Sequence, residues 1–252
     1  MKEATPLVMI HGLMGSLDFY APGRRFGTRA VHTLDMIGYG QLKDDIHTPI
    51  TLANQAAHVI RYLHDRVGER CVLLGHSVGG AIAMLVAALA PEKVRGVINV
   101  EGNFTLADAF WCAKIARLDE AEWRSQYQNL VADPEGWLRS SDISVTPQRS
   151  EWAHQILTNQ PCETIQAMAH AVVEETGSPR YLEQVRRVVE RGTSLFLLAG
   201  ERSASGWDLP DWVRSSARSS IVQKDVGHMM MLEQPDEFCN VVSQMLAQLQ
   251  QE

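Results

Sequence analysis

The chain has 252 residues, which suits one large domain or one domain with an insertion and allows a sizeable buried core. Hydrophobic residues make up 45% and charged residues 21%, the proportions of a soluble globular protein, which argues against extended disorder. The formal net charge of −7 means that the chain has no excess of positive charge. Neither nucleic acid nor an anionic membrane surface is therefore an expected partner.

Short apolar runs alternate with helical patterns over the first part of the chain. Strands are predicted at residues 6–10, 28–36, 71–75 and 94–100, and helices at 53–67 and from Val78 to just before Pro91. The strands are apolar on both faces, which is typical of a parallel sheet covered on both sides. We therefore expect an α/β fold with a mostly parallel sheet and helices on both faces.

The pattern changes between residues 103 and 190, where amphipathic segments follow one another without a clear strand. Strands resume at 194–200 and 219–226, and a last helix is predicted near 235–250. One sheet with a helical insertion after its fourth strand explains this order. Residues 1–102 and 191–252 would form the core. Residues 103–190 would form a lid over the carboxyl ends of the strands, where such sheets bind ligands.

The sequence shows no secretory signal or membrane span before or between the predicted elements, and its cysteines are scattered. The residues before the first strand lack the apolar core of a secretory signal, and no apolar run approaches the roughly 20 residues of a membrane span. The four cysteines, Cys71, Cys112, Cys162 and Cys239, form no C-x-x-C pair and are expected to be free thiols. We expect a cytoplasmic protein that contacts no membrane and uses no metal or cofactor.

The stretch LLGHSVGG, residues 73–80, carries a G-x-S-x-G pattern between a predicted strand and a predicted helix. This is the order of a nucleophile elbow, a turn so tight that its serine is strained and the residues two positions away must be small. Gly75 and Gly79 meet that requirement around Ser77. Ser77 is therefore the predicted nucleophile. The alternative is a glycine-rich turn with a helix-capping serine.

A serine needs a base before it can attack a carbonyl carbon, and nine histidines compete for that role. His228 stands apart because it follows the last predicted strand, in DVGHMMMLEQPDEF, shortly before a helix. A base in that loop can reach over the carboxyl edge of the sheet toward Ser77, whereas His76 would point away at the sharp turn. His228 is the predicted base. The alternative is a loop histidine that bonds locally to Asp225.

An oxyanion needs preorganised hydrogen-bond donors. One predicted donor is the backbone N–H of Val78, directly after the nucleophile. The second would come from the loop HGLMG after the first strand, where Gly12 permits a tight turn and the Leu13 N–H can point into the site. The alternative for this loop is an ordinary glycine turn.

Four motifs, MIHGLMGS, LDMIGYG, LLGHSVGGAIAM and DVGHMMMLEQPDEF, resemble the α/β-hydrolase superfamily in their order and spacing. The chain looks most like the branch that holds lipase-like esterases, haloalkane dehalogenases, C–C bond hydrolases, cofactor-free haloperoxidases and thioesterases. The resemblance implies the α/β-hydrolase fold, a lid and a Ser–His–acid triad. It departs at Ile37, where the family usually has a proline in a loop that shapes the substrate pocket.

The resemblance leaves the acid open. In most of the superfamily the acid is an aspartate in a G-x-x-D pattern after the strand at 194–200, but Ser203 stands at that position here. Glu101, at the end of the strand 94–100, is our predicted acid, because some relatives place the acid there and a buried carboxylate needs a partner. Asp208 is the first alternative, followed by Glu201 or a dyad without an acid. We expect Glu101 within about 2.6–3.2 Å of His228, and Ser203 not.

The predicted function is a serine hydrolase that forms an acyl-enzyme from a small or medium carboxylic ester or thioester. Aromatic residues in the insertion and Met229–Met231 suggest an apolar or aromatic acyl group, although most of them should simply pack. The alternatives are a C–C bond hydrolase or a pathway acyltransferase, and a non-catalytic ligand-binding protein on the same fold. The expected partner is a small-molecule substrate, and the expected state is a monomer or homodimer. Arg24 and Arg25 could meet an acidic group, or form a solvated surface pair.

Overall fold

A computed structural model describes residues 4–45 and 47–249. These residues form a six-stranded sheet in the order β2-β1-β3-β4-β5-β6, with every neighbouring pair parallel. The strands are β1 (Leu7–Ile10), β2 (Val31–Thr33), β3 (Cys71–His76), β4 (Val94–Val100), β5 (Ser194–Gly200) and β6 (Ser219–Gln223). The predicted parallel α/β sheet is confirmed. The strand expected at 28–36 is shorter, because only three of its residues pair with β1.

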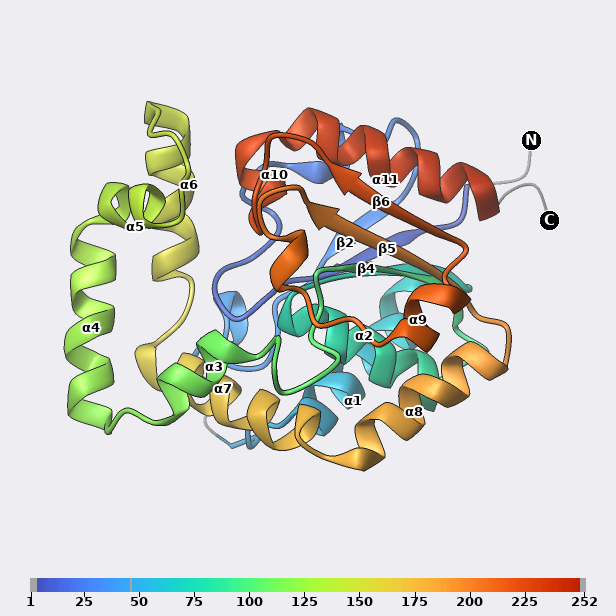
Figure 1. Ribbon diagram of the computed structural model, residues 1–252, viewed down its shortest axis with the longest axis horizontal. Helices are drawn as coiled ribbons and strands as arrows, with labels where there is room; N and C mark the ends of the chain where they lie inside the picture. Colours follow the sequence, from blue (N-terminus) through green and yellow to red (C-terminus); the bar gives the residue numbers. More distant parts are fainter. Residues whose placement is uncertain (1–3, 46, 250–252) are drawn as a thin grey trace.

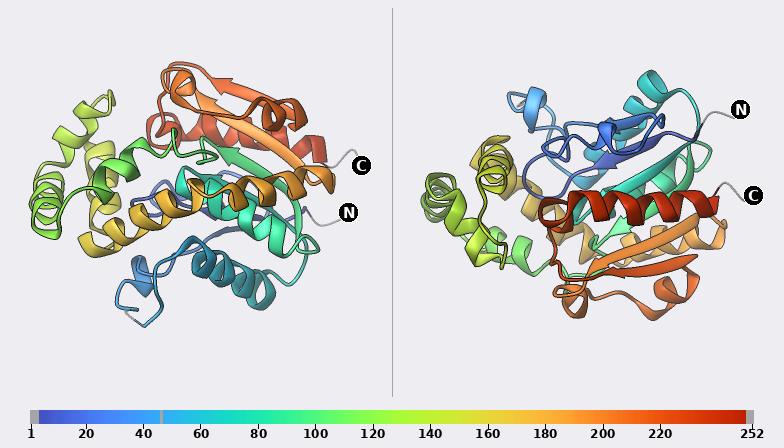
Figure 2. Two further views of the ribbon diagram at one scale, coloured as in Figure 1. Left: turned by 60° about the horizontal axis from the view of Figure 1, so that its bottom comes forward. Right: turned by 90° about the horizontal axis from the view of Figure 1, so that it is seen from above.

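Helices cover both faces of the sheet (Figures 1 and 2). One face carries α1 (Leu52–Tyr62), α2 (Val78–Leu89) and α8 (Pro179–Glu190), and the other carries α11 (Pro235–Leu249). Side chains of each strand alternate between the two layers, as the period of a strand requires. Val8 and Ile10 of β1 pack into the first, whereas Leu7 and Met9 pack into the second.

The sequence accounts for the end of α1 and for the burial of α2. A π-helical turn (Leu63–Val67) extends α1, and Gly68 ends it with a φ of 75° and an N–H that donates to the Leu63 carbonyl. The next helix, α2, is buried along most of its length between the sheet and other helices, which explains why its sequence is apolar all round.

All helices between β4 and β5 belong to the segment in which no strand is predicted. They are α3 (Phe110–Ala116), α4 (Glu120–Ala132), α5 (Pro134–Ser140), α6 (Pro147–Thr158), α7 (Cys162–Thr176) and α8. In Figure 1, α4, α5 and α6 stand apart from the sheet, at the end toward which the strands point. The last helix, α8, packs against α2 and so contributes to the layer on the sheet.

The sequence explains where these helices begin. A capping box joins Asp119 and Glu122 at the start of α4, and the Thr146 side chain accepts the Arg149 N–H at the start of α6. Helix α5, which is absent from the predicted segments, has Asp133 as its N-cap and proline at its first position.

Short elements complete the chain. They are α9 (Asp211–Ser216), also not predicted, α10 (Met230–Glu233), and the 3₁₀ turns η1 (Pro22–Arg24), η2 (Gly40–Leu42) and η4 (Ala204–Gly206). Of the helices in the described part of the chain, none has both the length and the apolar character needed to cross a membrane.

Candidate active site

Ser77 lies between β3 and α2, in the strained turn that its motif predicts. Its backbone has a φ of 54° and a ψ of −124°, a conformation that a non-glycine residue adopts only under constraint. A Cβ on Gly75 would lie 2.2 Å from the Gly79 carbonyl oxygen, and one on Gly79 would lie 2.2 Å from that of Ile10. Close backbone approach therefore requires glycine on both sides of the serine.

Glu101 and His228 meet at the carboxyl edge of the sheet. Glu101 directly follows β4 and has a φ of 43°, whereas His228 lies in the loop after β6. Nδ1 of His228 lies 2.6 Å from Oε2 of Glu101, so the hydrogen bond expected between them is present. Because an ionised carboxylate only accepts, the imidazole donates from Nδ1, and its neutral form has a lone pair on Nε2. The Glu101 side chain is 5% exposed and that of His228 is 43% exposed, so the histidine remains open to a substrate.

The second oxygen of Glu101 has two donors of its own. The Ser203 hydroxyl donates to Oε1 at 2.6 Å, and the Gly200 N–H donates to the same oxygen at 2.7 Å. Burial alone would raise the pKa of Glu101. The hydrogen bond and charge of His228, together with the bonds from Ser203 and Gly200, outweigh burial and lower this pKa. The carboxylate is therefore held in its ionised form.

The other carboxylates considered for this position point elsewhere. Asp208 is exposed, and its Oδ2 accepts a hydrogen bond from the Thr105 hydroxyl at 2.5 Å. Glu201 is also exposed and accepts the Asp225 N–H at 3.0 Å. Neither carboxylate makes a hydrogen bond to His228.

The hydroxyl of Ser77 and the ring of His228 come from neighbouring loops but, within the described residues, share no hydrogen bond. The ring of His228 lies 4.6 Å from the ring of His76, the residue before the serine. Bonds between a catalytic nucleophile and its base are often long without a substrate and shorten when one binds.

His76 connects the turn of Ser77 to the loop of His228. Its ring is buried, and Nε2 lies 3.0 Å from the backbone carbonyl oxygen of His228, so Nε2 carries the proton. Burial, with the nearby His228, lowers the pKa of His76 to about 3. His76 is therefore neutral near pH 7 and acts as a fixed hydrogen-bond donor to the loop.

The loop after β1 brings Gly12 and Leu13 beside Ser77. A Cβ on Gly12 would lie 3.1 Å from both the Ser77 Cβ and the His76 Nδ1, so the loop passes close to the elbow. In the described residues, neither the Leu13 N–H nor the Val78 N–H donates to another group of the protein. Both amides are thus available to a ligand.

The same loop is tied to the helices between β4 and β5. Gln160, between α6 and α7, is buried and accepts the Gly15 N–H on Oε1 at 2.8 Å. Its Nε2 donates to the Tyr127 hydroxyl of α4 at 3.0 Å. The neighbouring Asn159 donates to the Gly15 carbonyl at 3.1 Å. Movement of the segment around Gln160 would therefore act on the loop that carries Leu13.

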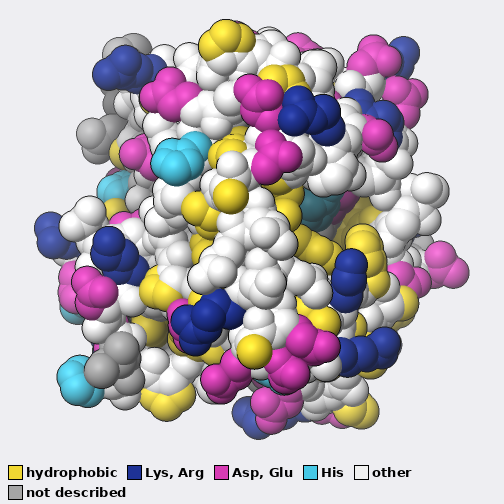
Figure 3. Space-filling view, turned by 90° about the vertical axis from the view of Figure 1, so that its left-hand side faces the viewer, with side chains coloured by type: hydrophobic (Ala, Val, Ile, Leu, Met, Phe, Trp, Pro, Cys, Tyr) yellow, Lys and Arg dark blue, Asp and Glu magenta, His cyan; other side chains and the backbone are white. Residues whose placement is uncertain are grey.

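Apolar side chains lie beside the site on the side of α4, α5 and α6. Figure 3 views the end of the molecule that carries α4, α5 and α6, where hydrophobic side chains gather along a hollow near the middle of the face. Met14 and Met229 are partly buried and pack against a cluster that includes Trp137. Met230 and Met231 are fully buried in the core, so only one residue of the methionine run remains available as a pocket wall.

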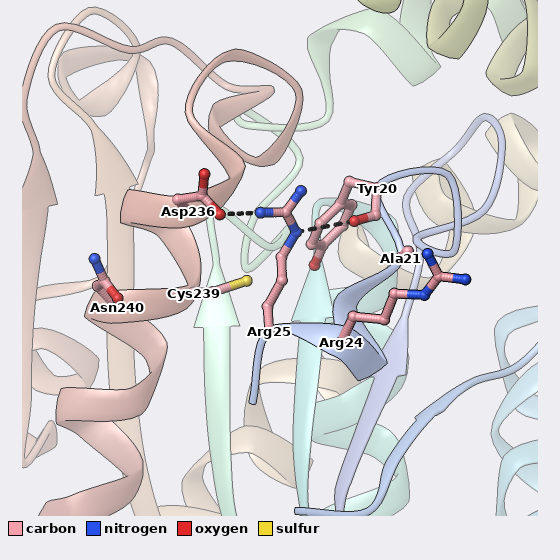
Figure 4. Close-up of a pocket in the computed structure, with 7 residues that line it drawn as sticks. All are labelled: Tyr20, Ala21, Arg24, Arg25, Asp236, Cys239 and Asn240. Carbon is pink, nitrogen blue, oxygen red and sulfur yellow. Dashed lines mark hydrogen bonds and ion pairs between the residues drawn. The ribbon is translucent and has the colours of Figure 1, made fainter. Parts of the chain in front are cut away.

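A pocket of about 370 Å³ lies away from these residues, between the loop after β1 and the start of α11 (Figure 4). Arg25 forms an ion pair with Asp236 there and donates through Nε to the Tyr20 carbonyl at 3.0 Å (Figure 4). Arg24 also lines the pocket, but its side chain points away from Asp236 (Figure 4). The positive charge of Arg24 and Arg25 together is thus partly neutralised at the surface.

No group of three or more His, Cys, Asp or Glu in residues 4–45 and 47–249 is placed to hold a metal ion.

The sequence does not predict that Ser203 contributes to the site. Ser203 stands where a carboxylate is usual in the superfamily, and the sequence suggests only that the position is empty. Its hydroxyl instead holds the carboxylate that comes from the neighbouring strand. No signal in the sequence announces this contact, because the two residues are 102 positions apart.

Known proteins resemble this chain in sequence and in fold. The chain is 33% identical over 140 residues, 52% of its length, to the sn-1-specific diacylglycerol lipase ABHD11 of Danio rerio, of which the match covers 42%. The chain thus spans less than half the length of the first curated relatives it matches.

Solved structures extend the likeness to the whole fold. A carboxylesterase of Nitrososphaera gargenis superposes with a TM-score of 0.77 at 19% identity, covering 98% of this chain and 92% of that one. An esterase of Exiguobacterium antarcticum superposes with a TM-score of 0.75 at 15% identity, covering 98% and 93%. Residues 7–241 match the profile of the Alpha/beta hydrolase family. The chain therefore belongs to the alpha/beta hydrolase family.

Proposed function

We propose that this protein is a serine hydrolase that cleaves carboxylic esters or thioesters through an acyl-enzyme. The observation that carries the proposal is the hydrogen bond of 2.6 Å between Glu101 and His228, at the sheet edge where Ser77 occupies a strained turn. An acid that orients a histidine beside an activated serine is the arrangement of a catalytic triad. The esterase and lipase names of several relatives support the same chemistry.

In the first half of the proposed reaction, Oγ of Ser77 attacks the carbonyl carbon of the substrate while Nε2 of His228 takes the hydroxyl proton. Glu101 holds the imidazole through Nδ1 and stabilises its positive charge. The Leu13 and Val78 N–H groups bind the oxyanion of the tetrahedral intermediate. The intermediate collapses when His228 returns the proton to the departing alcohol or thiol, which leaves an ester on Ser77.

In the second half, water replaces the departed alcohol or thiol. His228 takes a proton from the water as it attacks the acyl carbon, and the same two amides bind the new oxyanion. Collapse releases the carboxylic acid and returns the proton to Ser77. In each half, one bond to the acyl carbon forms, another breaks, and His228 carries one proton. The protein is therefore unchanged after a turnover.

An apolar acyl group suits the surroundings of the site. Met14 and Met229 lie beside an apolar cluster in which Trp137, Leu138 and Ile156 are buried. Apolar walls bind an acyl chain by removing its apolar surface from water, and they offer no positive charge to an anionic acyl group.

We further propose that the helices between β4 and β5 act as a lid, because Gln160 joins them to the loop of Leu13.

Turnover on a panel of p-nitrophenyl esters and acyl-thioesters of graded chain length tests this proposal. We expect hydrolysis that is fastest for apolar acyl groups and that falls by at least about 10³-fold in Ser77→Ala. Equal rates for the wild type and Ser77→Ala across the whole panel would refute the proposal and favour a ligand-binding protein on the same fold.

A further inference from the structure

The Gly12–Leu13 peptide is the part of the proposed oxyanion site that a loop must hold in place. Its N–H belongs to Leu13 and its carbonyl to Gly12, on opposite edges of one plane. The described chain has no cis peptide bond, so the two groups point in opposite directions. Whatever holds the Gly12 carbonyl therefore sets the direction of the Leu13 N–H.

His11 holds that carbonyl. Its Nδ1 lies 2.8 Å from the Gly12 oxygen, and because a carbonyl only accepts, Nδ1 carries the proton. The ring is 2% exposed, and Nε2 is buried without a hydrogen-bond partner in the described residues. Burial lowers the pKa of His11 to about 4, only partly offset by the bond to Gly12. His11 is thus a neutral, singly protonated donor near pH 7.

Tyr39 holds the next carbonyl along the chain. Its hydroxyl donates to the Leu13 oxygen at 2.8 Å, and its side chain is fully buried. The rings of Tyr39 and His11 meet edge to face, with centroids 4.6 Å apart. Tyr39 belongs to the LDMIGYG motif, for which the catalytic steps above give no role.

We infer that His11 and Tyr39 are positioning residues for the oxyanion site, which together fix the two peptides on either side of Leu13 so that its N–H meets the substrate oxyanion. This inference rests on the proposed function. Both side chains are buried, so we expect neither to touch the substrate. Their effect is therefore expected on the transition state, where the oxyanion carries full charge, and not on ground-state binding.

Three substitutions separate the hydrogen bonds from packing. Tyr39→Phe removes only the hydroxyl, and His11→Phe keeps a ring but removes the donor. His11→Asn keeps an N–H donor close to the place of Nδ1. Tyr20→Phe is the matched control, because Tyr20 is equally buried but its hydroxyl contacts Met9 Sδ, on the other face of the sheet.

Two measurements report the effect on the oxyanion site, in variants whose thermal unfolding matches that of the wild type. One is the separation of kcat from KM on the best ester of the panel. The other is the affinity for a trifluoromethyl ketone, which forms an oxyanion on Ser77, compared with the affinity for a neutral amide analogue of the substrate. Tyr39→Phe and His11→Phe should lower kcat and ketone affinity together by about 10- to 100-fold. KM and amide affinity should stay within about twofold of wild type, and His11→Asn should recover most of the loss.

Unchanged kcat and ketone affinity in folded Tyr39→Phe would overturn the inference. Equal losses in His11→Asn and His11→Phe would do the same, because they would assign the effect to ring packing. A wild-type protein that neither turns over esters nor binds the ketone would instead refute the proposed function, and that result is visible before any variant is made.

Discussion

Glu101 lies 2.6 Å from Nδ1 of His228, although 127 positions separate the two residues in the chain. The contact joins the end of β4 to the loop after β6, across the end of β5. It places the carboxylate one strand away from the position at which most of the superfamily carries it. Ser203, at that usual position, bonds to the same carboxylate, so both strand ends contribute to one site.

This contact predicts a large difference between two amide substitutions. Glu101→Gln should lower kcat by about 10⁴-fold, because an amide cannot stabilise the charged imidazolium and can turn the ring to the wrong tautomer. Asp208→Asn should stay within about twofold of wild type, since Asp208 bonds to Thr105. Steady-state kinetics on one ester measure both. Near-wild-type turnover of Glu101→Gln would show that the assignment of the acid is wrong.

Ser203→Ala tests the second hydrogen bond to the carboxylate. Loss of this donor should raise the pKa of Glu101, because the Ser203 bond is one of the contacts that lower it. We expect kcat to fall by about tenfold near neutral pH and by a larger factor at acid pH, where more of Glu101 becomes protonated. The profile of kcat against pH measures this, with the exposed Ser205→Ala as control. A deficit that is constant across pH would argue against the proposed role of Ser203.

Gly79→Ala should destabilise the fold itself. The added Cβ would lie 2.2 Å from the Ile10 carbonyl oxygen, and backbone atoms cannot move away as a flexible side chain can. We expect the free energy of unfolding to fall by about 3 kcal/mol. Gly206→Ala is the matched control, because an added Cβ there meets no atom within 4 Å. Urea denaturation should leave the control near wild type, and equal stability of the two variants would contradict the close approach.

Stability should fall as the pH drops below neutral. Burial lowers the pKa of His11 from 6.5 to about 4 and that of His76 from 6.5 to about 3, so in that interval only the unfolded chain takes up these protons. Folding then becomes less favourable as the pH falls through 6.5 toward 4. Asp108 opposes the trend, because burial raises its pKa to about 6 and the folded protein gains that proton.

Urea denaturation at pH 7 and pH 5 measures this linkage. His11→Asn and His76→Gln keep a donor but cannot take up a proton, so each should reduce the loss of stability between the two pH values. The exposed Gln155→Leu, which removes no titratable group, should leave the loss unchanged. A pH dependence that is the same in all three variants would exclude the buried histidines as its source.

Gln160→Leu should loosen the contact between the helices that precede β5 and the loop that carries Leu13. The substitution leaves the buried Gly15 N–H without its acceptor, which should cost about 1–3 kcal/mol of unfolding free energy. Gln155→Leu on α6 is the control, because Gln155 is exposed and its side chain donates to Glu151 on its own helix. Chemical denaturation compares them. Equal stability of both variants would show that the Gly15 contact contributes little.

Much of the fold can be predicted from the sequence because its signals are local. Apolar runs mark the strands, glycines frame Ser77, and the helices follow amphipathic patterns. Helix α5 also has a local signal, an Asp133 cap followed by proline, which is easily overlooked because the helix has only seven residues. The extent of the lid stays a prediction, while α8, inside the predicted boundary, packs against α2.

The rest of the site could not be predicted because it depends on contacts between distant segments. Nothing near Ser203 in the chain indicates that it faces Glu101, and nothing near Tyr39 indicates that its hydroxyl reaches Leu13. These partners become neighbours only when parallel strands end at one edge of the sheet. Glu101 itself was predictable as a candidate, since a carboxylate at the end of an apolar strand needs a partner.

The most direct measurement is the intact mass and peptide map of the protein after reaction with a fluorophosphonate. A single adduct on Ser77 is expected, formed quickly by the wild type and by Asp208→Asn, and at least about 10²-fold more slowly by His228→Ala and Glu101→Gln. A folded wild-type protein that gains no adduct on Ser77, or gains one at the same rate in all four forms, would contradict a triad of Ser77, His228 and Glu101.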